Sequence, residues 1–259
     1  MKQHTISFAG AGRLAGILCR EMHQTGFMID IIVSESGERG RSLAGLCNAK
    51  WSDKLKFPDS TEIIIVAVPD NLLKAVIDKI ECRNETLVAH TAGSIGLDVF
   101  PDRISRRGVF YPLQTFSHGR KIIFRDLPVF IEASDKQSSE LLGDIADSLR
   151  ARKYFTGVEQ RRMLHLAAVF ICNFTNHMLT QGKSLAQRSG FSFEELKPLI
   201  QETFMKAMEE GPENSQTGPA IRNDINTLDK HLELLSFDRD LQEIYTEISR
   251  SIIKYHLKL

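Results

Sequence analysis

The chain has 259 residues, of which 42% are hydrophobic and 25% are charged, proportions typical of a globular protein with a substantial core. Its 33 basic and 33 acidic residues cancel, which gives no electrostatic reason to expect binding to nucleic acid or to an anionic membrane surface. No apolar run approaches the roughly 20 residues of a membrane-spanning helix. Four scattered cysteines without Cys-x-x-Cys spacing indicate reduced thiols in a cytoplasmic protein, and predict neither a disulfide framework nor a metal site.

The first part of the chain alternates strand-like and helix-like segments. Strands are predicted over residues 4–9, 28–34, 62–68, 86–91, 108–111 and 127–132, with a last strand near Tyr154. Amphipathic helices are predicted over 14–24, 71–80 and 136–150. The runs 31–33 and 63–68 are apolar on both faces, as central parallel strands require when helices cover both sides of the sheet. The pattern predicts an α/β fold with a doubly wound parallel sheet in a domain spanning residues 1–156.

A Gly-x-Gly-x-x-Ala turn joins the first predicted strand to the first predicted helix. Gly10 permits the tight turn, Gly12 has no Cβ to keep the backbone from a phosphate, and Ala15 lets the helix pack close to its strand. The helix that begins with Arg13 and Leu14 directs free N–H groups at an anion. These residues predict a dinucleotide-binding site, with a purely structural turn as the alternative.

The end of the second predicted strand favours NADP over NAD. Ser34 stands where NAD enzymes usually place a carboxylate for the ribose 2′-hydroxyl, and Arg39 and Arg41 lie just beyond it. Guanidinium groups bind phosphate through paired hydrogen bonds, so a 2′-phosphate suits this segment. Glu35 keeps NAD possible, and a solvated polar loop is the structural alternative.

The later strands end in small and polar residues that would share one edge of the sheet. Cofactor contacts are predicted at this edge, and so are substrate contacts at Ser94 and Gln114. The predicted cofactor contacts at this edge are Val68, Pro69, Thr91, Ala92 and Gly93. His90 and Tyr111 are candidate catalytic residues there, although His90 could equally be a hydrogen-bonded core histidine.

Residues 157–259 are predicted to form a helical domain. Apolar residues recur at helical spacing over 160–193, 193–210 and 224–254. At about 100° per residue, His165, Cys172 and Asn176 fall on one face, with Asn173 at its border. This polar stripe suggests a groove or an interface with catalytic candidates His165 and Asn173. A buried histidine bonded to backbone or water is the alternative.

The segment Thr217–Asp224 is the most distinctive part of the helical half. Gly218-Pro219 should rigidify the chain where a helix begins, with Thr217 able to cap it. Arg222 is predicted to hold a substrate carboxylate or phosphate, and Asp224 is a second candidate substrate residue. An Arg222–Asp224 contact that only braces the loop is the alternative.

Taken together, these motifs resemble the Rossmann-like proteins that carry a DUF2520 domain, a branch of the 6-phosphogluconate dehydrogenase-like superfamily. Pyrroline-5-carboxylate reductase and the F420-dependent NADP oxidoreductases are related families. The matching segments are 10–15, 67–70, 90–94, 111–116, 165–170 with Asn173, and 217–224. The resemblance implies an N-terminal NADP-binding domain, a C-terminal helical domain, and a homodimer built through the helices.

Two positions depart from the patterns of these families. The family often has histidine before Pro-Leu-Gln, where this chain has Tyr111, and a phenol with a pKa near 10 shuttles protons less readily than imidazole. β-Hydroxyacid dehydrogenases of the superfamily use a Lys-x-x-x-Asn pair, but Val169 precedes Asn173 by four residues here. The missing lysine disfavours a simple hydroxyacid dehydrogenase.

The leading hypothesis is an NADP-dependent oxidoreductase that reduces an imine or carbonyl of a small anionic substrate. The residues named above supply the candidate proton donors and the anion-holding Arg222. A non-catalytic NADP-binding sensor or scaffold is the alternative from another class, and use of F420 with NADP is a third reading suggested only by kinship.

Overall fold

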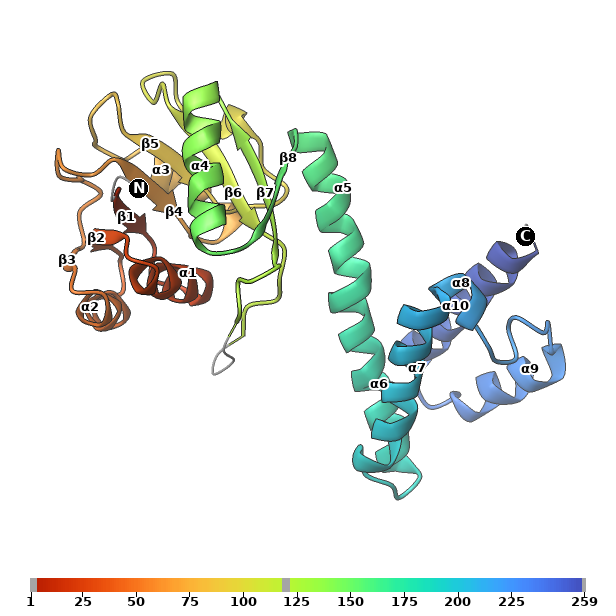
Figure 1. The fold of residues 1–259 in the computed structure, drawn as a ribbon. Coiled ribbons are helices and arrows are strands. Elements are labelled where there is room, and N and C mark those ends of the chain that lie inside the picture. Colours follow the sequence, from red (N-terminus) through yellow and green to blue (C-terminus); the bar gives the residue numbers. More distant parts are fainter. Residues whose placement is uncertain (1–3, 118–121, 258–259) are drawn as a thin grey trace. The chain divides into compact units, whose positions relative to one another are not determined.

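The computed structural model describes residues 4–117 and 122–257. The chain divides into two compact units, Met1–His177 and Met178–Leu259, each of which is described by itself (Figure 1). The domain boundary at residues 156–157 expected from the sequence lies earlier in the chain than this division, and remains a prediction.

The first unit is built on a twisted sheet of eight strands in the described part of the chain, in the order β3-β2-β1-β4-β5-β6-β7-β8 (Figure 1). The strands are β1 (Thr5–Ala9), β2 (Met28–Val33), β3 (Lys50–Ser52), β4 (Ile63–Val66), β5 (Leu87–His90), β6 (Arg107–Pro112), β7 (Pro128–Ala133) and β8 (Arg152–Phe155). The order reverses direction at β1, where β2 lies on one side and β4 on the other. This is the strand order of a dinucleotide-binding Rossmann domain, which binds its ligand beyond the carboxyl ends of the strands near that point.

One strand pair departs from the parallel sheet that the sequence predicted. β6 and β7 are antiparallel, with Val109 opposite Glu132 and Tyr111 opposite Phe130. Parallel neighbours need a crossover connection, whereas antiparallel strands can be joined by a loop. The described residues between β6 and β7 contain no helix, so the chain returns along β6 in the opposite direction.

Both faces of the sheet are buried, as the apolar runs predicted. Ile63 and Ile65 of β4 belong to the same core cluster as Leu18 of the first helix, while Ile64 and Val66 belong to the cluster on the other face. The helices of this layered part are α1 (Arg13–Gln24), α2 (Gly37–Leu46), α3 (Asp70–Ile77) and α4 (Lys136–Ser148), with the short 3-10 helix η1 (Leu97–Val99). α1 and α4 pack on one face and α3 on the other, which is the doubly wound arrangement.

A long helical segment follows β8 and contains a π-helical turn. It comprises α5 (Val158–Ala168), the π-helix η2 (Val169–Phe174) and α6 (Thr175–Arg188). The helical character was predicted, but the π-helical turn was not. A π-helix winds less per residue than an α-helix because its hydrogen bonds join residues five apart. The alignment of His165 with Asn176, calculated at a constant helical angle, is therefore wrong across η2.

The second unit is helical, as predicted. Its further helices are η3 (Glu194–Leu196), α7 (Lys197–Glu210), α8 (Pro212–Ser215), α9 (Ile225–Leu234) and α10 (Arg239–His256). The prediction that Thr217 caps a helix at Gly218-Pro219 is wrong, because the helix begins at Ile225 and Asp224 caps it. His231 Nδ1 lies 2.7 Å from the Tyr245 hydroxyl and joins α9 to α10.

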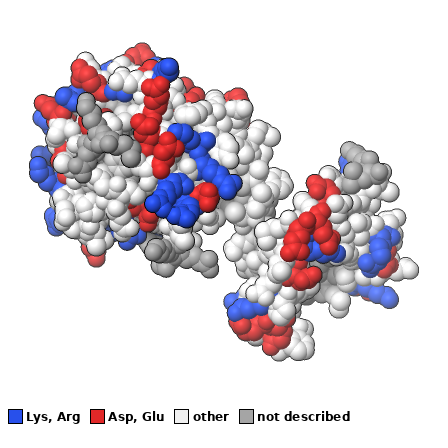
Figure 2. Space-filling model, in the orientation of Figure 1, with Lys and Arg blue, Asp and Glu red and all other residues white. Residues whose placement is uncertain are grey.

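Acidic and basic side chains are mixed on the surface of each unit. On the face drawn in Figure 2, acidic and basic side chains lie beside one another on each unit.

The four cysteines are free thiols. The sulfur atoms of Cys19 in α1 and Cys47 at the end of α2 lie 3.4 Å apart. No helix within the described ranges has both the length and the hydropathy needed to cross a membrane.

Candidate functional site

The turn after β1 has the geometry that a dinucleotide pyrophosphate requires. Gly10 has φ +114°, and a Cβ on this residue would stand 2.3 Å from the Ala67 carbonyl oxygen. Apart from its chain neighbours, no heavy atom of the described residues lies within 4 Å of a Cβ built on Gly12, so the space above it is open. No side chain in the described ranges caps α1, and the first turn of this helix carries no acidic residue. Free N–H groups of the helix therefore face an open cradle, which fits a phosphate anion.

Substitutions at the two glycines should differ in their effect on the free energy of unfolding. We expect Gly10→Ala to lower the free energy of unfolding by roughly 2 to 5 kcal/mol, because the new methyl meets the Ala67 carbonyl in a strained backbone conformation. Gly12→Ala should change it by less than about 1 kcal/mol, since its methyl enters open space. Urea unfolding measures both, and equal losses would contradict this geometry.

Arginines of α1 and of the segment after β2 line a hollow beside the cradle. A hollow of about 700 Å³ is lined by Gly12 and the exposed Arg13, Arg20 and Arg39, with the carboxylates of Glu21 and Glu38 at its wall. Among the described residues, none of these three arginines has a carboxylate oxygen within 4.0 Å (the salt-bridge distance). Their guanidinium groups are thus available to a phosphate.

The hydroxyl of Ser34, a predicted cofactor contact, forms hydrogen bonds within the protein. It donates to the Ser36 carbonyl at 3.0 Å and accepts from Trp51 Nε1 at 3.2 Å. These bonds occupy the hydroxyl in shaping the loop, which argues against a direct contact between Ser34 and a ribose phosphate. Arg41 lies over the Trp51 ring, 4.3 Å from its centroid, and Arg39 donates to the Ser36 hydroxyl at 3.3 Å.

The carboxyl ends of β4, β5 and β6 bring several predicted residues together. Gly93 lies against the Tyr111 ring, since a Cβ there would be 2.6 Å from Tyr111 Cζ. The Ser94 hydroxyl donates to Asp70 Oδ2 at 3.2 Å. Thr91 and Ala92 are buried, Val68 is half-buried, and Pro69 is exposed as the residue before α3. Asp70, the first residue of α3, joins this group through that bond.

Tyr111 and His165 form a hydrogen bond that the sequence did not foresee. The Tyr111 hydroxyl lies 3.1 Å from His165 Nδ1, although β6 and α5 bring these residues together from positions 54 apart. Burial raises the pKa of Tyr111, and the charges of Asp70 and Cys172 raise it further. The phenol therefore keeps its proton at neutral pH and can donate it.

His90 is better described as a core histidine than as a catalytic one. It is fully buried and stacks on Phe100 with ring centroids 5.5 Å apart. Its Nδ1 accepts from the Ala92 N–H at 3.2 Å, which leaves Nε2–H to donate to the Gly96 carbonyl at 3.4 Å. Burial lowers its pKa to about 4, and the charge of Arg161 contributes to this shift. Both ring nitrogens brace the loop after β5, which argues against the predicted catalytic role.

This burial should appear as pH-dependent stability. Because the folded-state pKa of His90 lies below its ordinary value of 6.5, protonation favours the unfolded chain, and stability is lost as pH falls from about 6.5 towards 4. Between about pH 7.5 and about pH 4.5 the loss should be roughly 2.5 kcal/mol. We expect His90→Gln to show a correspondingly smaller loss in urea unfolding at the two pH values. An equal loss in both proteins would argue against a buried neutral imidazole.

The remaining predicted site residues have simple surroundings. The exposed Gln114 accepts from the Thr115 N–H at 2.7 Å, and Asn173 is exposed on η2. In the second unit, Arg222 is exposed. Asp224 accepts from the Thr227 N–H at 3.2 Å and from its hydroxyl at 2.7 Å, bonds that lower the Asp224 pKa. These capping bonds occupy the Asp224 carboxylate and argue against its predicted contact with substrate.

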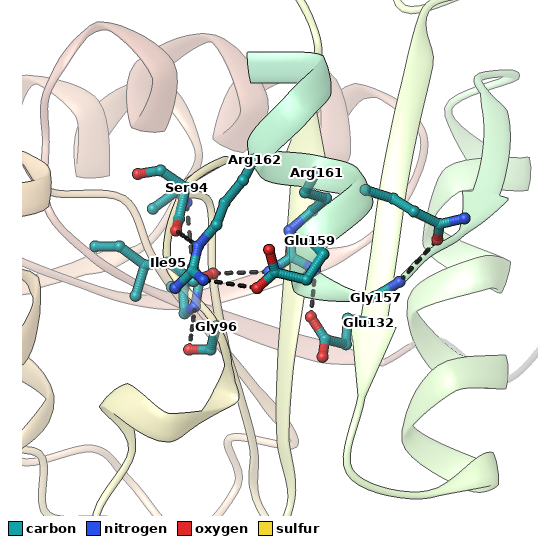
Figure 3. Close-up of polar contacts among 11 residues, drawn as sticks. Ser94, Ile95, Gly96, Glu132, Gly157, Glu159, Arg161 and Arg162 are labelled. Atoms are coloured by element: carbon teal, nitrogen blue, oxygen red, sulfur yellow. Dashed lines mark hydrogen bonds and ion pairs between the residues drawn. The ribbon is translucent and has the colours of Figure 1, made fainter. Parts of the chain in front are cut away.

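Two consecutive arginines of α5 were not predicted from the sequence as site residues. Figure 3 shows Arg161 and Arg162 reaching the loop after β5: Arg161 donates to the Ile95 carbonyl at 2.7 Å and Arg162 to the Ser94 carbonyl at 2.9 Å. Arg161 also forms an ion pair with Glu132 of β7. With His90 on Gly96, side chains therefore hold three successive carbonyls of this loop. A buried arginine gives no sequence signal that distinguishes it from a solvated one.

The fold and the glycine cradle define a dinucleotide-binding Rossmann protein. Residues 5–93 match the family described as NADP oxidoreductase coenzyme F420-dependent, and residues 127–252 match the domain of unknown function DUF2520. No curated protein matches the sequence.

Solved structures extend the comparison to nearly the whole chain. A candidate NADP oxidoreductase from Bacteroides fragilis is 39% identical, with a TM-score of 0.87 over 97% of this chain and 98% of that one. The chain belongs to its family, the Rossmann oxidoreductases with a DUF2520 domain, as the motifs predicted. Two more distant structures share the fold, each 14% identical. An imine reductase from Myxococcus stipitatus in complex with NADP+ has a TM-score of 0.67 over 98% and 93% of the two chains. A pyrroline-5-carboxylate reductase from Coxiella burnetii has a TM-score of 0.60 over 99% and 98%.

Proposed function

We propose that this protein is an NADP-dependent oxidoreductase that reduces the imine or carbonyl group of a small anionic substrate. The observation that carries the proposal is the Tyr111–His165 hydrogen bond, which joins a proton donor to a second titratable group at the carboxyl edge of a Rossmann sheet. Family membership supports NADP as the cofactor.

The residues of the cradle fit NADP. The N–H groups at the start of α1 would hold the pyrophosphate above Gly12, and Arg39, with Arg13, would hold the 2′-phosphate. The loop Thr91–Gly93 would lie against the nicotinamide end. When bound, the reduced nicotinamide supplies a hydride to the carbon of the imine or carbonyl group.

Tyr111 supplies the proton in this scheme. With a proton on each ring nitrogen, His165 is a cation that donates from Nδ1 to the phenol oxygen and leaves the phenol hydrogen for the substrate nitrogen or oxygen. The phenol proton passes to that atom as negative charge develops on it, and the Nδ1 proton of His165 passes to the phenol oxygen. The neutral imidazole then takes a proton from solvent for the next cycle.

Arg222 of the second unit stays the predicted anion-binding residue. This exposed guanidinium has no ion pair within 4 Å among the described side chains and can bind a carboxylate or a phosphate. Asn173 and Ser94 offer hydrogen bonds to the same class of substrate.

An assay of NADPH oxidation tests the proposed reduction of an imine or carbonyl group. Purified protein with NADPH is offered a panel of cyclic imines, keto acids and aldehydes, and loss of NADPH absorbance is followed. We expect turnover of at least one imine or carbonyl compound that carries a carboxylate, and slower turnover of its uncharged analogue. Saturable NADPH binding with no oxidation across the panel would overturn the proposal and favour a non-catalytic sensor. Electron transfer to F420 would favour the third reading.

We also propose that the protein is a homodimer joined through its helical part. Met163, Leu166, Phe170 and Phe174 on α5 and η2 are each about half exposed or more, and the Phe170 and Phe174 rings contact at 4.9 Å. Large apolar side chains gathered in this way are typical of a protein interface. Sedimentation equilibrium should give twice the chain mass, and a monomer at micromolar concentration would contradict the dimer.

A further inference from the structure

Arg161 is a fully buried cation that the proposed proton transfer does not use. Its guanidinium pairs with Glu132, which is itself largely buried, and donates to the Ile95 carbonyl at 2.7 Å (Figure 3). A buried charge is costly unless it is paired and hydrogen-bonded, so moving α5 away from Glu132 and Ile95 with Arg161 still buried would be unfavourable. Close packing adds to the attachment, since a Cβ at Gly96 would lie 3.1 Å from Val158 Cγ2 at the start of α5.

Two contacts join α5 to the sheet, Arg161 with Glu132 and His165 with Tyr111, and their separation along the helix is close to their separation along the strand. Arg161 and His165 are four residues apart and share one face of α5, about 6 Å apart along its axis. Their partners show the same spacing. Glu132 is opposite Val109 of β6, and Tyr111 is two residues further along β6, about 7 Å away. One turn of the helix thus spans two residues of the strand.

We infer that Arg161 is a positioning residue for the Tyr111–His165 pair. Its attachment to Glu132 and Ile95 sets the height and rotation of α5 at which His165 Nδ1 meets the Tyr111 hydroxyl. This inference rests on the proposed function, in which Tyr111 is the proton donor. It adds that the donor's geometry depends on a residue that touches neither the substrate nor the cofactor.

Arg162 provides a matched control. It also donates to the loop, at the Ser94 carbonyl, but its side chain is 48% exposed and its second partner is Glu159 of the same helix. Arg162→Met therefore removes one loop contact and leaves the tie between α5 and β7. Arg161→Met removes that tie while keeping an apolar side chain of similar length.

The first experiment reads the hydrogen bond without cofactor or substrate. Side-chain NMR of nitrogen-15-labelled histidine reports the protonation and hydrogen bonding of His165 Nδ1, with Tyr111→Phe as the reference for a broken bond. We expect Arg161→Met to move the His165 signal to the Tyr111→Phe position, and Arg162→Met to leave it at the wild-type position. An unchanged His165 signal in Arg161→Met would overturn the inference.

A double variant covers the case in which Arg161→Met does not fold. Replacing a buried ion pair by apolar residues of similar size is often neutral for stability, so Arg161→Met with Glu132→Met should fold. The same displaced His165 signal is expected in it. Failure of both variants to fold would contradict the inference, because Arg161 would then be needed for folding and not for this geometry.

The second experiment tests whether Arg161 acts through Tyr111. With NADPH and the carboxylate-bearing cyclic imine 1-pyrroline-2-carboxylate as the probe, Arg161→Met should lower kcat by about 10-fold in the wild-type background and less than about 2-fold in Tyr111→Phe. Equal losses in both backgrounds would overturn the inference. Absence of any turnover with the probe counts against the proposed function, while the NMR experiment still decides the positioning role.

Discussion

Tyr111→Phe should lower kcat for reduction of a productive imine or carbonyl substrate by about 100-fold or more, the range typical of a lost general acid. The substitution removes only the hydroxyl. The ring still packs against Gly93 and near Phe130, whose centroid lies 6.4 Å away, so the fold should be unchanged. Steady-state kinetics with NADPH measures the effect.

The matched control is NADPH affinity. Because the Tyr111 hydroxyl contacts His165 and not the glycine cradle, the Kd for NADPH should stay within about 2-fold of wild type. His165→Asn should lower kcat in the same direction, and combining it with Tyr111→Phe should add little. A Tyr111→Phe protein with wild-type kcat would assign the proton donor elsewhere.

Arg39→Ala should weaken NADPH binding by about 10- to 100-fold and leave NADH binding nearly unchanged. A hydrogen-bonded guanidinium–phosphate contact is worth roughly 1.5 to 3 kcal/mol, and each 1.4 kcal/mol is about 10-fold in Kd. Only NADPH carries the 2′-phosphate, so the two cofactors separate this contact from general damage to the site. Fluorescence titration with each cofactor gives both constants.

Arg152 supplies the control for nonspecific charge loss. This exposed arginine of β8 pairs with Asp126 at 3.4 Å, and Arg152→Ala removes the same charge away from the cradle. Its NADPH affinity should equal that of wild type. Equal weakening by both variants, or loss of NADH affinity in Arg39→Ala, would contradict a 2′-phosphate site at Arg39.

The layered fold could be predicted because its causes are local in sequence. The run Ile63–Val66 is apolar on both faces, and a strand with that pattern needs helices above and below it. Gly10 and Gly12 mark a turn whose geometry depends on their own missing side chains. The short β3, with three residues, carries too little pattern to be recognised.

The arrangement of the site could be predicted only in part. Strand ends meet at one edge of a parallel sheet, so Gly93, Ser94 and Tyr111 could be grouped from sequence alone. The partner of Tyr111 could not, because His165 reaches it only through the direction of α5, which Arg161 and Glu132 fix. Likewise, the stacking of Phe100 on His90 could not be predicted, because the sequence pattern around Phe100 does not show where its ring lies.

Titration of the wild-type protein with NADPH, followed by nicotinamide fluorescence, shows whether the glycine cradle and Arg39 bind this cofactor. We expect saturable binding of one NADPH per chain, at least about 10-fold tighter than NADH, with the preference lost in Arg39→Ala. The absence of saturable binding at millimolar NADPH or NADH would contradict this expectation.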